Sequence, residues 1–224
     1  SDCCRNGAII NMANPLSESM SFLTYVNVDS SNPNSTPTFL TPPVAYLPAD
    51  SIWQYNPLPF DPDGDSLVWT ISVPLGEDFA NPVPPVVSGY VSLSDTVLYS
   101  NTNGIFSMNQ ITGEITWSPK MVGNFAASIA IQEYRNGVFI GGMSRDMQFV
   151  VVPDSMNAMP QISNMQSFPT NNMGYPYVQI APGTNFQVSL LASDPDANDI
   201  VSLAAFGEPF GLNNSPSTFS YMLT

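Results

Sequence analysis

Short runs of β-branched and aromatic residues, partly alternating with polar residues, recur along the chain and are separated by turn residues. Such runs predict strands, whereas helical patterns are scarce because prolines interrupt the chain throughout. Asn-Gly and Thr-Gly pairs between the runs are typical of hairpin turns. The pattern predicts an all-β antiparallel sandwich. We expect strands at residues 65–73, 89–100, 113–118, 125–134, 137–142 and 145–152.

Three short motifs recur in the same order about 130 residues further along the chain, which predicts tandem sandwich repeats. DCCRNGAIIN (2–11) matches QEYRNGVFIG (132–141), NSTPTF (34–39) matches NAMPQI (157–162), and FDPDGDSLVW (60–69) matches SDPDANDIVS (193–202).

These motifs also predict the domain boundaries. We expect residues 1–29 to be the C-terminal hairpin of a preceding repeat, 30–153 a complete β-sandwich repeat, and 154–224 the N-terminal part of a following repeat. The chain begins without Met and without a signal-peptide pattern. We therefore expect it to be an internal or processed piece of a longer protein.

The third motif contains a candidate metal site. Asp61, Asp63 and Asp65 alternate with a proline and a glycine. Three carboxylates this close repel one another unless a hard cation lies among them, and Ca²⁺ takes six to eight oxygen ligands. The alternative interpretation is a polar turn between strands. The second copy of the motif predicts a site formed by Asp194, Asp196, Asn198 and Asp199.

The composition excludes several functions. The net charge of −14 and the four basic residues argue against nucleic acid as a partner, and no apolar run is long enough for direct membrane insertion. Because the chain has no His, it lacks the Ser-His, Cys-His and His-bearing zinc sites of many enzymes, and we expect no enzyme. The candidate glutamates for carboxylate-pair catalysis are more simply interpreted as surface or turn residues: Glu77, Glu114, Glu133 and Glu208.

The only cysteines are the adjacent Cys3 and Cys4. The repeat alignment predicts that both lie on a strand leading into an Asn-Gly turn, where neighbouring side chains point to opposite faces. A shared metal site is therefore disfavoured, and a bond between adjacent cysteines demands a strained geometry. We expect disulfide partners in an upstream part of the protein or in a neighbouring chain, with free thiols as the alternative.

Three motifs carry a resemblance to a known family: DPDGDSLV (61–68), TGEITWSP (112–119) and EYRNG (133–137). They resemble the cadherin-like, dystroglycan-type and immunoglobulin-like repeats of very large secreted surface proteins of Bacteroidota. The resemblance implies Greek-key sandwiches, export to the cell surface, commonly by type IX secretion, and a role in adhesion, gliding or filaments.

The resemblance also implies calcium between consecutive domains, held partly by the linkers. The linker residues that match are Asp29, Asn32, Asn34, Asp154 and Asn157, and Glu133 resembles the acidic strand residue that closes such sites. The linkers have fewer acidic residues than the cadherin pattern, so a single ion bound in each loop stays an equal alternative.

The resulting hypothesis is a structural or adhesive repeat segment of a very large extracellular surface protein, and two expectations accompany it. The first is stiffening by structural calcium. The second is assembly into a homo-oligomer or filament through weakly charged faces that grip a surface or another cell. The alternative function is a carbohydrate-binding, lectin-like module with a glycan target, in which aromatic side chains form a sugar platform, namely Trp53, Trp69, Trp117 and the tyrosines.

Overall fold

The computed structural model describes residues 4–28, 32–39, 41–57, 59–77, 83–95, 104–154, 158–172, 174–205, 208–211 and 214–220. The contacts within the chain divide it into two compact units. The first unit comprises residues 1–156 with 206–217, and the second comprises residues 157–205 with 218–224.

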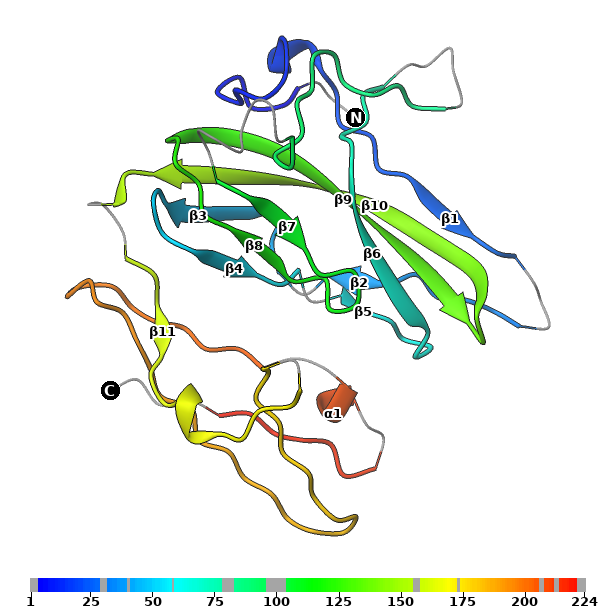
Figure 1. Cartoon of the computed structure of the whole chain (residues 1–224). Helices are drawn as coiled ribbons and strands as arrows, with labels where there is room; N and C mark the ends of the chain where they lie inside the picture. Colours follow the sequence, from blue (N-terminus) through cyan, green and yellow to red (C-terminus); the bar gives the residue numbers. More distant parts are fainter. Residues whose placement is uncertain are drawn as a thin grey trace. The chain divides into compact units, whose positions relative to one another are not determined.

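The first unit is built around one five-stranded sheet, here called the main sheet, in which the strands lie in the order β1-β10-β9-β6 and β3 pairs with the far half of β10 (Figure 1). Its strands are β1 (Thr24–Val26), β3 (Val44–Pro48), β6 (Ser66–Ser72), β9 (Gly123–Arg135) and β10 (Val138–Val152). All pairings in the main sheet are antiparallel except that of β3 with β10, which is parallel.

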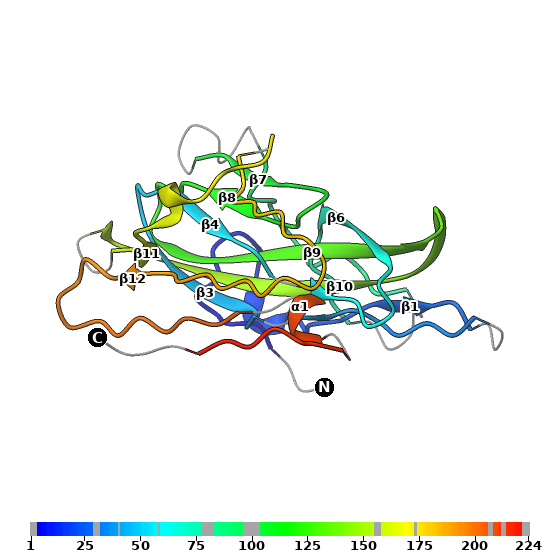
Figure 2. The same cartoon turned by 90° about the horizontal axis from the view of Figure 1, so that it is seen from below.

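A long hairpin of β9 and β10 forms the centre of the main sheet. Asn136 and Gly137 connect the two strands with φ angles of 53° and 77°, as the Asn-Gly pair predicts for a two-residue turn. The two strands predicted at 137–142 and 145–152 are one continuous strand, β10. The hairpin extends along the full length of the sheet, which is clearest from below (Figure 2).

A second, three-stranded sheet provides the other layer of the sandwich. It consists of β4 (Trp53–Tyr55), β8 (Ile115–Trp117) and β7 (Phe106–Met108), in the order β4-β8-β7. The fully buried Trp117 packs at its ring edge on Phe125 of β9, with centroids 5.4 Å apart, and Trp53 packs in the same way on Phe149 of β10 at 5.2 Å. This aromatic core confirms the predicted all-β, sandwich-like fold.

Two short strands, β2 (Thr38–Phe39) and β5 (Pro59–Phe60), pair at the entrance to the acidic loop. The first unit also contains a 3₁₀ turn, η1 (Pro15–Ser17), and a short helix, α1 (Glu208–Gly211). No described helix is long and apolar enough to cross a membrane.

The strand predicted at 89–100 is wrong over its described part, residues 89–95. Ser92 and Asp95 form a turn, in which the Asp95 amide donates to the Ser92 carbonyl at 3.0 Å. The Val91 amide donates to the Asn11 carbonyl and the Val91 carbonyl accepts from the Asn11 side chain, while Leu93 is buried at 2 % exposure. The apolar residues of this segment are therefore buried from a loop rather than from a strand.

Residues 4–28 pack on the main sheet instead of forming a separate hairpin. Ile9 makes a parallel bridge to Asn124 of β9, where β6 has already ended. The Asn11 side chain then accepts from the amide of Ala126 and donates to its carbonyl, both at 2.8 Å. Because β1 pairs with β10, the same segment covers parts of both edges of the main sheet. The boundary at residue 29 is therefore not a break in packing, and as a division of a parent protein into repeats it stays a prediction.

The predicted strand at the cysteines is also not seen, because Cys4 and Arg5 lie outside any strand. Cys4 is disulfide-bonded within this chain, which departs from the expected partner upstream or in another chain. Cys3 lies outside the described residues.

The second unit has little regular structure in its described part. It contains the short strands β11 (Gln161–Ile162) and β12 (Ala192–Ser193), which pair antiparallel, and the 3₁₀ turn η3 (Met165–Ser167). Most of its apolar side chains are exposed.

Candidate metal centre

The acidic loop after β5 is organised by its own first residue. Asp61 Oδ1 accepts hydrogen bonds from the amides of Asp63 and Asp65, at 2.9 and 3.0 Å. Gly64 has a φ of +77°, which a residue with a side chain rarely adopts, and its amide bonds the Asp61 carbonyl. Oxygens of the three carboxylates lie within 4.8 Å of one another. The three carboxylates are therefore gathered in one turn, as both interpretations of the sequence require, and the metal site stays a prediction.

Arg135, at the end of β9, closes this loop from the side. The register of β6 on β9 pairs Ser66 with Tyr134, which places Arg135 beside Asp65. Its guanidinium makes two parallel hydrogen bonds to the Asp65 carboxylate, at 2.7 and 2.8 Å, and lies 3.6 Å from Asp63. This pairing raises the pKa of Arg135. The Asp65 side chain is only 4 % exposed, and its buried charge is paired with that of Arg135.

The same guanidinium holds the linker that precedes β2. It donates to the side-chain oxygens of Asn32 and Asn34 and to the Pro33 carbonyl, at 2.8 to 3.1 Å. The linker also donates back to the loop, because the Ser35 amide bonds Asp63 Oδ2 at 2.6 Å. The linker asparagines predicted as metal ligands therefore lie at the loop, and their oxygens are bound by a cation of the protein itself.

Glu133 is the buried acid of the centre. Its side chain is 0 % exposed, which corrects the interpretation of this glutamate as a surface or turn residue. Oε2 accepts from Asn34 Nδ2 at 3.0 Å, whereas Oε1 has no hydrogen-bond partner among the described residues. Burial raises the pKa of Glu133 to about 7, the Asn34 hydrogen bond opposes this, and the nearby carboxylates of Asp61 and Asp65 raise it further.

Asp61 has the second buried oxygen of this kind. Its Oδ1 organises the loop, while Oδ2 is buried and has no partner among the described residues. Asp61 raises the pKa of Glu133 through its charge and through a side-chain hydrogen bond between the two carboxyl groups, which forms only when one of them is protonated. Two buried carboxylates with an unbound oxygen each are costly in this form, because a buried charge requires a proton or a cation.

The second acidic loop repeats the local arrangement. Oxygens of Asp194, Asp196 and Asp199 lie within 4.8 Å of one another, and the Asp196 amide donates to Asp194 Oδ1 at 2.8 Å. The amide of Ala158 bonds Asp196 Oδ2 at 2.6 Å, so in both loops a linker amide donates to the middle carboxylate. The repeat alignment sets Ala158 against the linker residue that makes this bond in the first loop.

The strand pairing beside the two loops is equivalent as well. Thr38 pairs with Phe60 in β2–β5, and Gln161 pairs with Ser193 in β11–β12. The repeated motifs align these same positions with one another. The sequence repeat is therefore also a structural repeat over the linker, the strand pair and the acidic loop.

Several predicted ligands do not join these clusters. Asp29 and Asn157 lie outside the described residues. Asp154 belongs to the first unit, where it accepts a hydrogen bond from Ser51 at 3.3 Å. Asn198 is exposed, and the third carboxylate of its loop comes from the next residue in the chain.

The predicted sugar platform is not formed by the tryptophans. Trp53, Trp69 and Trp117 are 7 %, 1 % and 0 % exposed and belong to the core.

Arg135 is the functional residue that the sequence analysis missed. Its Arg-Asn-Gly motif recurs at Arg5, but nothing local to the motif indicates an acidic partner. In the copy at residues 5–7, Arg5 instead forms a buried ion pair with Asp146 of β10.

Comparison with known proteins gives no relative for this chain: no protein-family model and no curated protein matches it.

Proposed function

We propose that the chain is a structural or adhesive repeat segment of a very large extracellular surface protein, and that its acidic loops bind calcium. The observation that carries the proposal is the pair of buried, unpartnered carboxylate oxygens, Asp61 Oδ2 and Glu133 Oε1, beside the acidic loop. Carboxylate oxygens are the ligands that Ca²⁺ prefers, and Asp61, Asp65 and Glu133 would hold it in the first loop.

The charges of the centre support a divalent cation. Four carboxylates, those of Asp61, Asp63, Asp65 and Glu133, face one guanidinium, that of Arg135. Calcium would supply the positive charge that these four carboxylates require beyond the single charge of Arg135. Because the linker is bonded to the loop, a metal that fixes the loop would also fix the junction between consecutive repeats.

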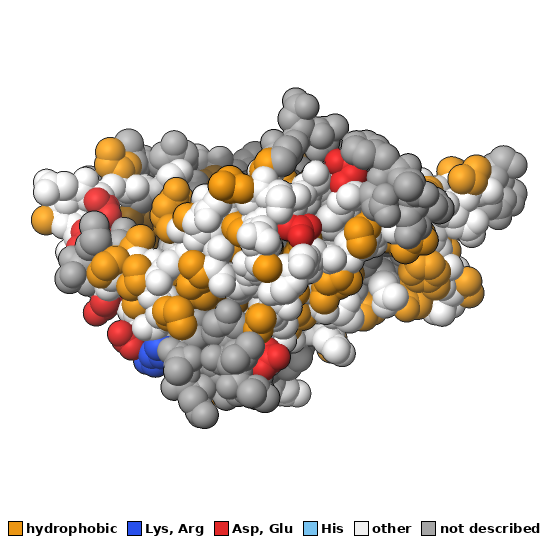
Figure 3. Space-filling model, turned by 90° about the horizontal axis from the view of Figure 1, so that it is seen from above, with side chains coloured by type: hydrophobic (Ala, Val, Ile, Leu, Met, Phe, Trp, Pro, Cys, Tyr) orange, Lys and Arg blue, Asp and Glu red, His pale blue; other side chains and the backbone are white. Residues whose placement is uncertain are grey.

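The equivalent loops and strand pairs support the tandem arrangement. A chain of stacked repeats sets reach and transmits force, which is what a surface fibre or adhesin requires. Only 10 % of the residues are charged, and one face of the molecule carries apolar and uncharged side chains with few acidic or basic ones among them (Figure 3). Such faces suit packing against further copies in a filament, the partner we propose.

The alternative, a carbohydrate-binding module, loses the support that the tryptophans gave it, because these residues are buried. Export and a cell-surface location rest on the resemblance of the motifs and are part of the same proposal.

Thermal unfolding of the full chain with calcium or with EDTA tests the proposal. Calcium at ten to a hundred times its dissociation constant stabilises a fold by about 1.4 to 2.7 kcal/mol per site. We expect Tm in 5 mM CaCl₂ to exceed that in EDTA by roughly 3 to 10 °C. An equal Tm in both conditions would contradict a stabilising calcium site.

Two controls make the result specific. Magnesium at the same concentration should give a smaller shift, because it demands stricter octahedral geometry. Glu133→Gln keeps the shape of the side chain and its bond with Asn34 but lowers the charge, so it should abolish most of the calcium-dependent shift. Microscopy of the full chain in calcium then tests assembly. We expect fibres, and isolated particles would contradict a filament.

A further inference from the structure

β1 lies at one border of the main sheet, and among the described strands it pairs with β10 alone (Figure 1). All three of its residues are exposed, Tyr25 at 57 % and Val26 at 43 %. An edge strand of this kind presents amide and carbonyl groups to which a further strand can bond.

The hydrogen bonds between β1 and β10 determine which groups of β1 face outward. Leu23 and Asn27, on either side of β1, both bond β10, through the Leu23 carbonyl at 2.8 Å and the Asn27 amide at 2.9 Å. Every second residue of an antiparallel strand bonds the same neighbour, so Tyr25 faces β10 as well. The amide and carbonyl groups of Thr24 and Val26 therefore point away from the main sheet.

This edge lacks the features that usually keep an edge strand from pairing, which are proline, charged side chains and bulges. β3 lies along the same side of β10 and has such protection, because it follows Pro42 and Pro43 and ends at Pro48. Residues 19–28, by contrast, contain no proline and no charged residue. The edge of β1 is therefore the less protected of the two.

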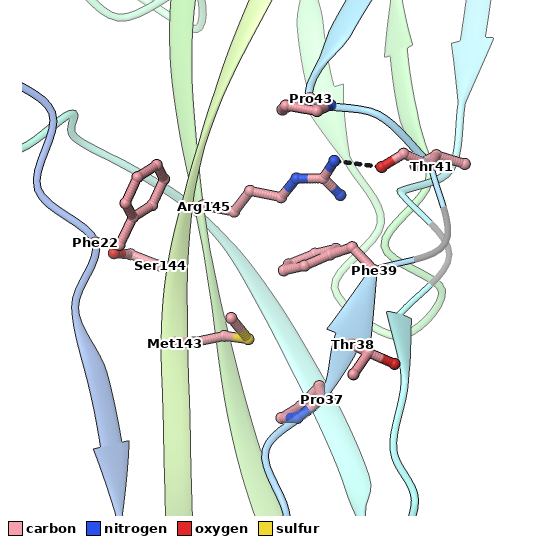
Figure 4. A pocket seen from close by; sticks show the side chains of 9 residues that line it. All are labelled: Phe22, Pro37, Thr38, Phe39, Thr41, Pro43, Met143, Ser144 and Arg145. Atoms are coloured by element: carbon pink, nitrogen blue, oxygen red, sulfur yellow. Dashed lines mark hydrogen bonds between the residues drawn. The ribbon is translucent and has the colours of Figure 1, made fainter.

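Exposed apolar side chains flank the free edge at both ends. Phe22 precedes β1 and is 60 % exposed, and Val28 follows it at 94 %. Figure 4 shows the Phe22 ring across β10 from Phe39 and Arg145, so it does not pack against either of them. A strand that pairs with β1 would cover these side chains, and this favours a partner strand that is itself apolar and uncharged.

A second copy of β1 meets these requirements, because its outward groups are symmetric about Tyr25. When two copies pair antiparallel about a twofold axis at Tyr25, Thr24 of each lies opposite Val26 of the other, and each pair exchanges both backbone hydrogen bonds. The two Tyr25 rings become neighbours on one face. The same register sets Phe22 opposite Val28 and brings no two charges together.

We propose that two copies of the chain pair through their β1 strands, antiparallel and with Tyr25 at the twofold axis, so that their main sheets join into one. Twofold contacts of this kind are the commonest between identical chains. This interface rests on the part of the proposed function in which copies of the chain associate, and it gives that association a surface. It does not require calcium, because β1 contributes nothing to the acidic loops.

Sedimentation velocity of the full chain over a range of concentrations, in calcium and in EDTA, tests the pairing. We expect a monomer–dimer equilibrium with a Kd on the order of 0.1 mM, since a short strand forms a small interface. Added salt should strengthen the dimer, because each chain carries a net charge of −14 and the paired strands carry none. Hydrogen exchange at the amides of Thr24 and Val26 should slow as the dimer forms.

Two variants disrupt the pairing without removing a bond to β10. Tyr25→Lys places two positive charges side by side at the axis, and Val26→Pro removes an amide that faces away from the main sheet. Each should weaken dimerisation roughly tenfold or more. Tyr46→Lys is the matched control, because it makes the same change of charge at a position of β3 that is 69 % exposed. It should dimerise like the unchanged protein.

Two results would overturn the pairing. A monomer at every concentration would leave the edge of β1 to a strand of another protein. Equal association of the unchanged protein and both β1 variants would place the contact between copies elsewhere and leave the proposed filament intact. Loss of the dimer in the two β1 variants, with the control unaffected, supports the pairing whether or not calcium raises Tm.

Discussion

The two acidic loops are alike in everything that their own sequence determines and differ in what the rest of the fold brings to them. In both, the first Asp accepts an amide of the loop, a linker amide bonds the middle Asp, and the preceding residue pairs in a short ladder. Among the described residues, only the first loop receives a guanidinium and a buried glutamate from a neighbouring strand, through Arg135 and Glu133.

The difference shows which features of the metal centre are determined by the sequence of the loop itself and which depend on distant residues. Residues 157–205 contain no Lys or Arg, so the second loop has no basic partner within this part of its unit. Its carboxylates are also more exposed, and solvent screens them. The loop conformation therefore forms without the cation, whereas burial of a carboxylate such as that of Asp65 requires it.

Replacing Arg135 by Met would give the first loop the environment of the second. It removes both bonds to Asp65 and the three that hold the linker, and it leaves a nearly buried carboxylate without a partner. We expect Tm of the full chain to fall by roughly 10 °C or more.

Lys120→Met is the matched control for this variant. Lys120 pairs with Asp50 at the surface, where both side chains are about half exposed, and an exposed ion pair contributes little. We expect a change of less than about 2 °C. Equal effects of the two variants would show that Arg135 is an ordinary surface residue.

The pH dependence of the metal-free protein separates the loops further, because in the part of the chain that the structure describes a fully buried acid, Glu133, lies beside the first loop only. The pKa of Glu133 is about 7 in the folded protein and 4.5 ordinarily, so the folded state binds its proton more tightly. The resulting stability is present in full below pH 4.5 and is lost as the pH rises through 7.

In EDTA we expect urea unfolding to give a free energy about 2 to 3 kcal/mol lower at pH 8 than at pH 5 from this group. Glu133→Gln does not titrate and should remove that part of the difference. A pH dependence that is unchanged in the variant would mean that Glu133 is not the titrating group.

The sequence was sufficient where structure depends on neighbours in the chain. The Asp-Pro-Asp-Gly-Asp loop, the Asn136-Gly137 turn and the strands of the central hairpin follow from local hydrogen bonding and alternation. The repeated motifs also coincide with the equivalent pairing of β2–β5 and β11–β12, although no strand was predicted at these positions.

The sequence was insufficient where distant segments meet. Arg135 reaches Asp65 only through the register of β6 on β9, which no local motif specifies. Residues 4–28 look like the end of a hairpin, yet they cover open edges of the main sheet, because β6 and β3 do not extend along the whole of β9 and β10. The same Arg-Asn-Gly motif therefore has different partners in its two copies.

Calorimetric titration of the full chain with calcium, in the unchanged protein and in Glu133→Gln and Asp194→Asn, tests the central claim most directly. The account predicts that Glu133→Gln removes the tighter binding event and leaves any weaker one, while Asp194→Asn leaves the tighter event intact. It would be contradicted if Glu133→Gln bound calcium like the unchanged protein, or if the unchanged protein bound none.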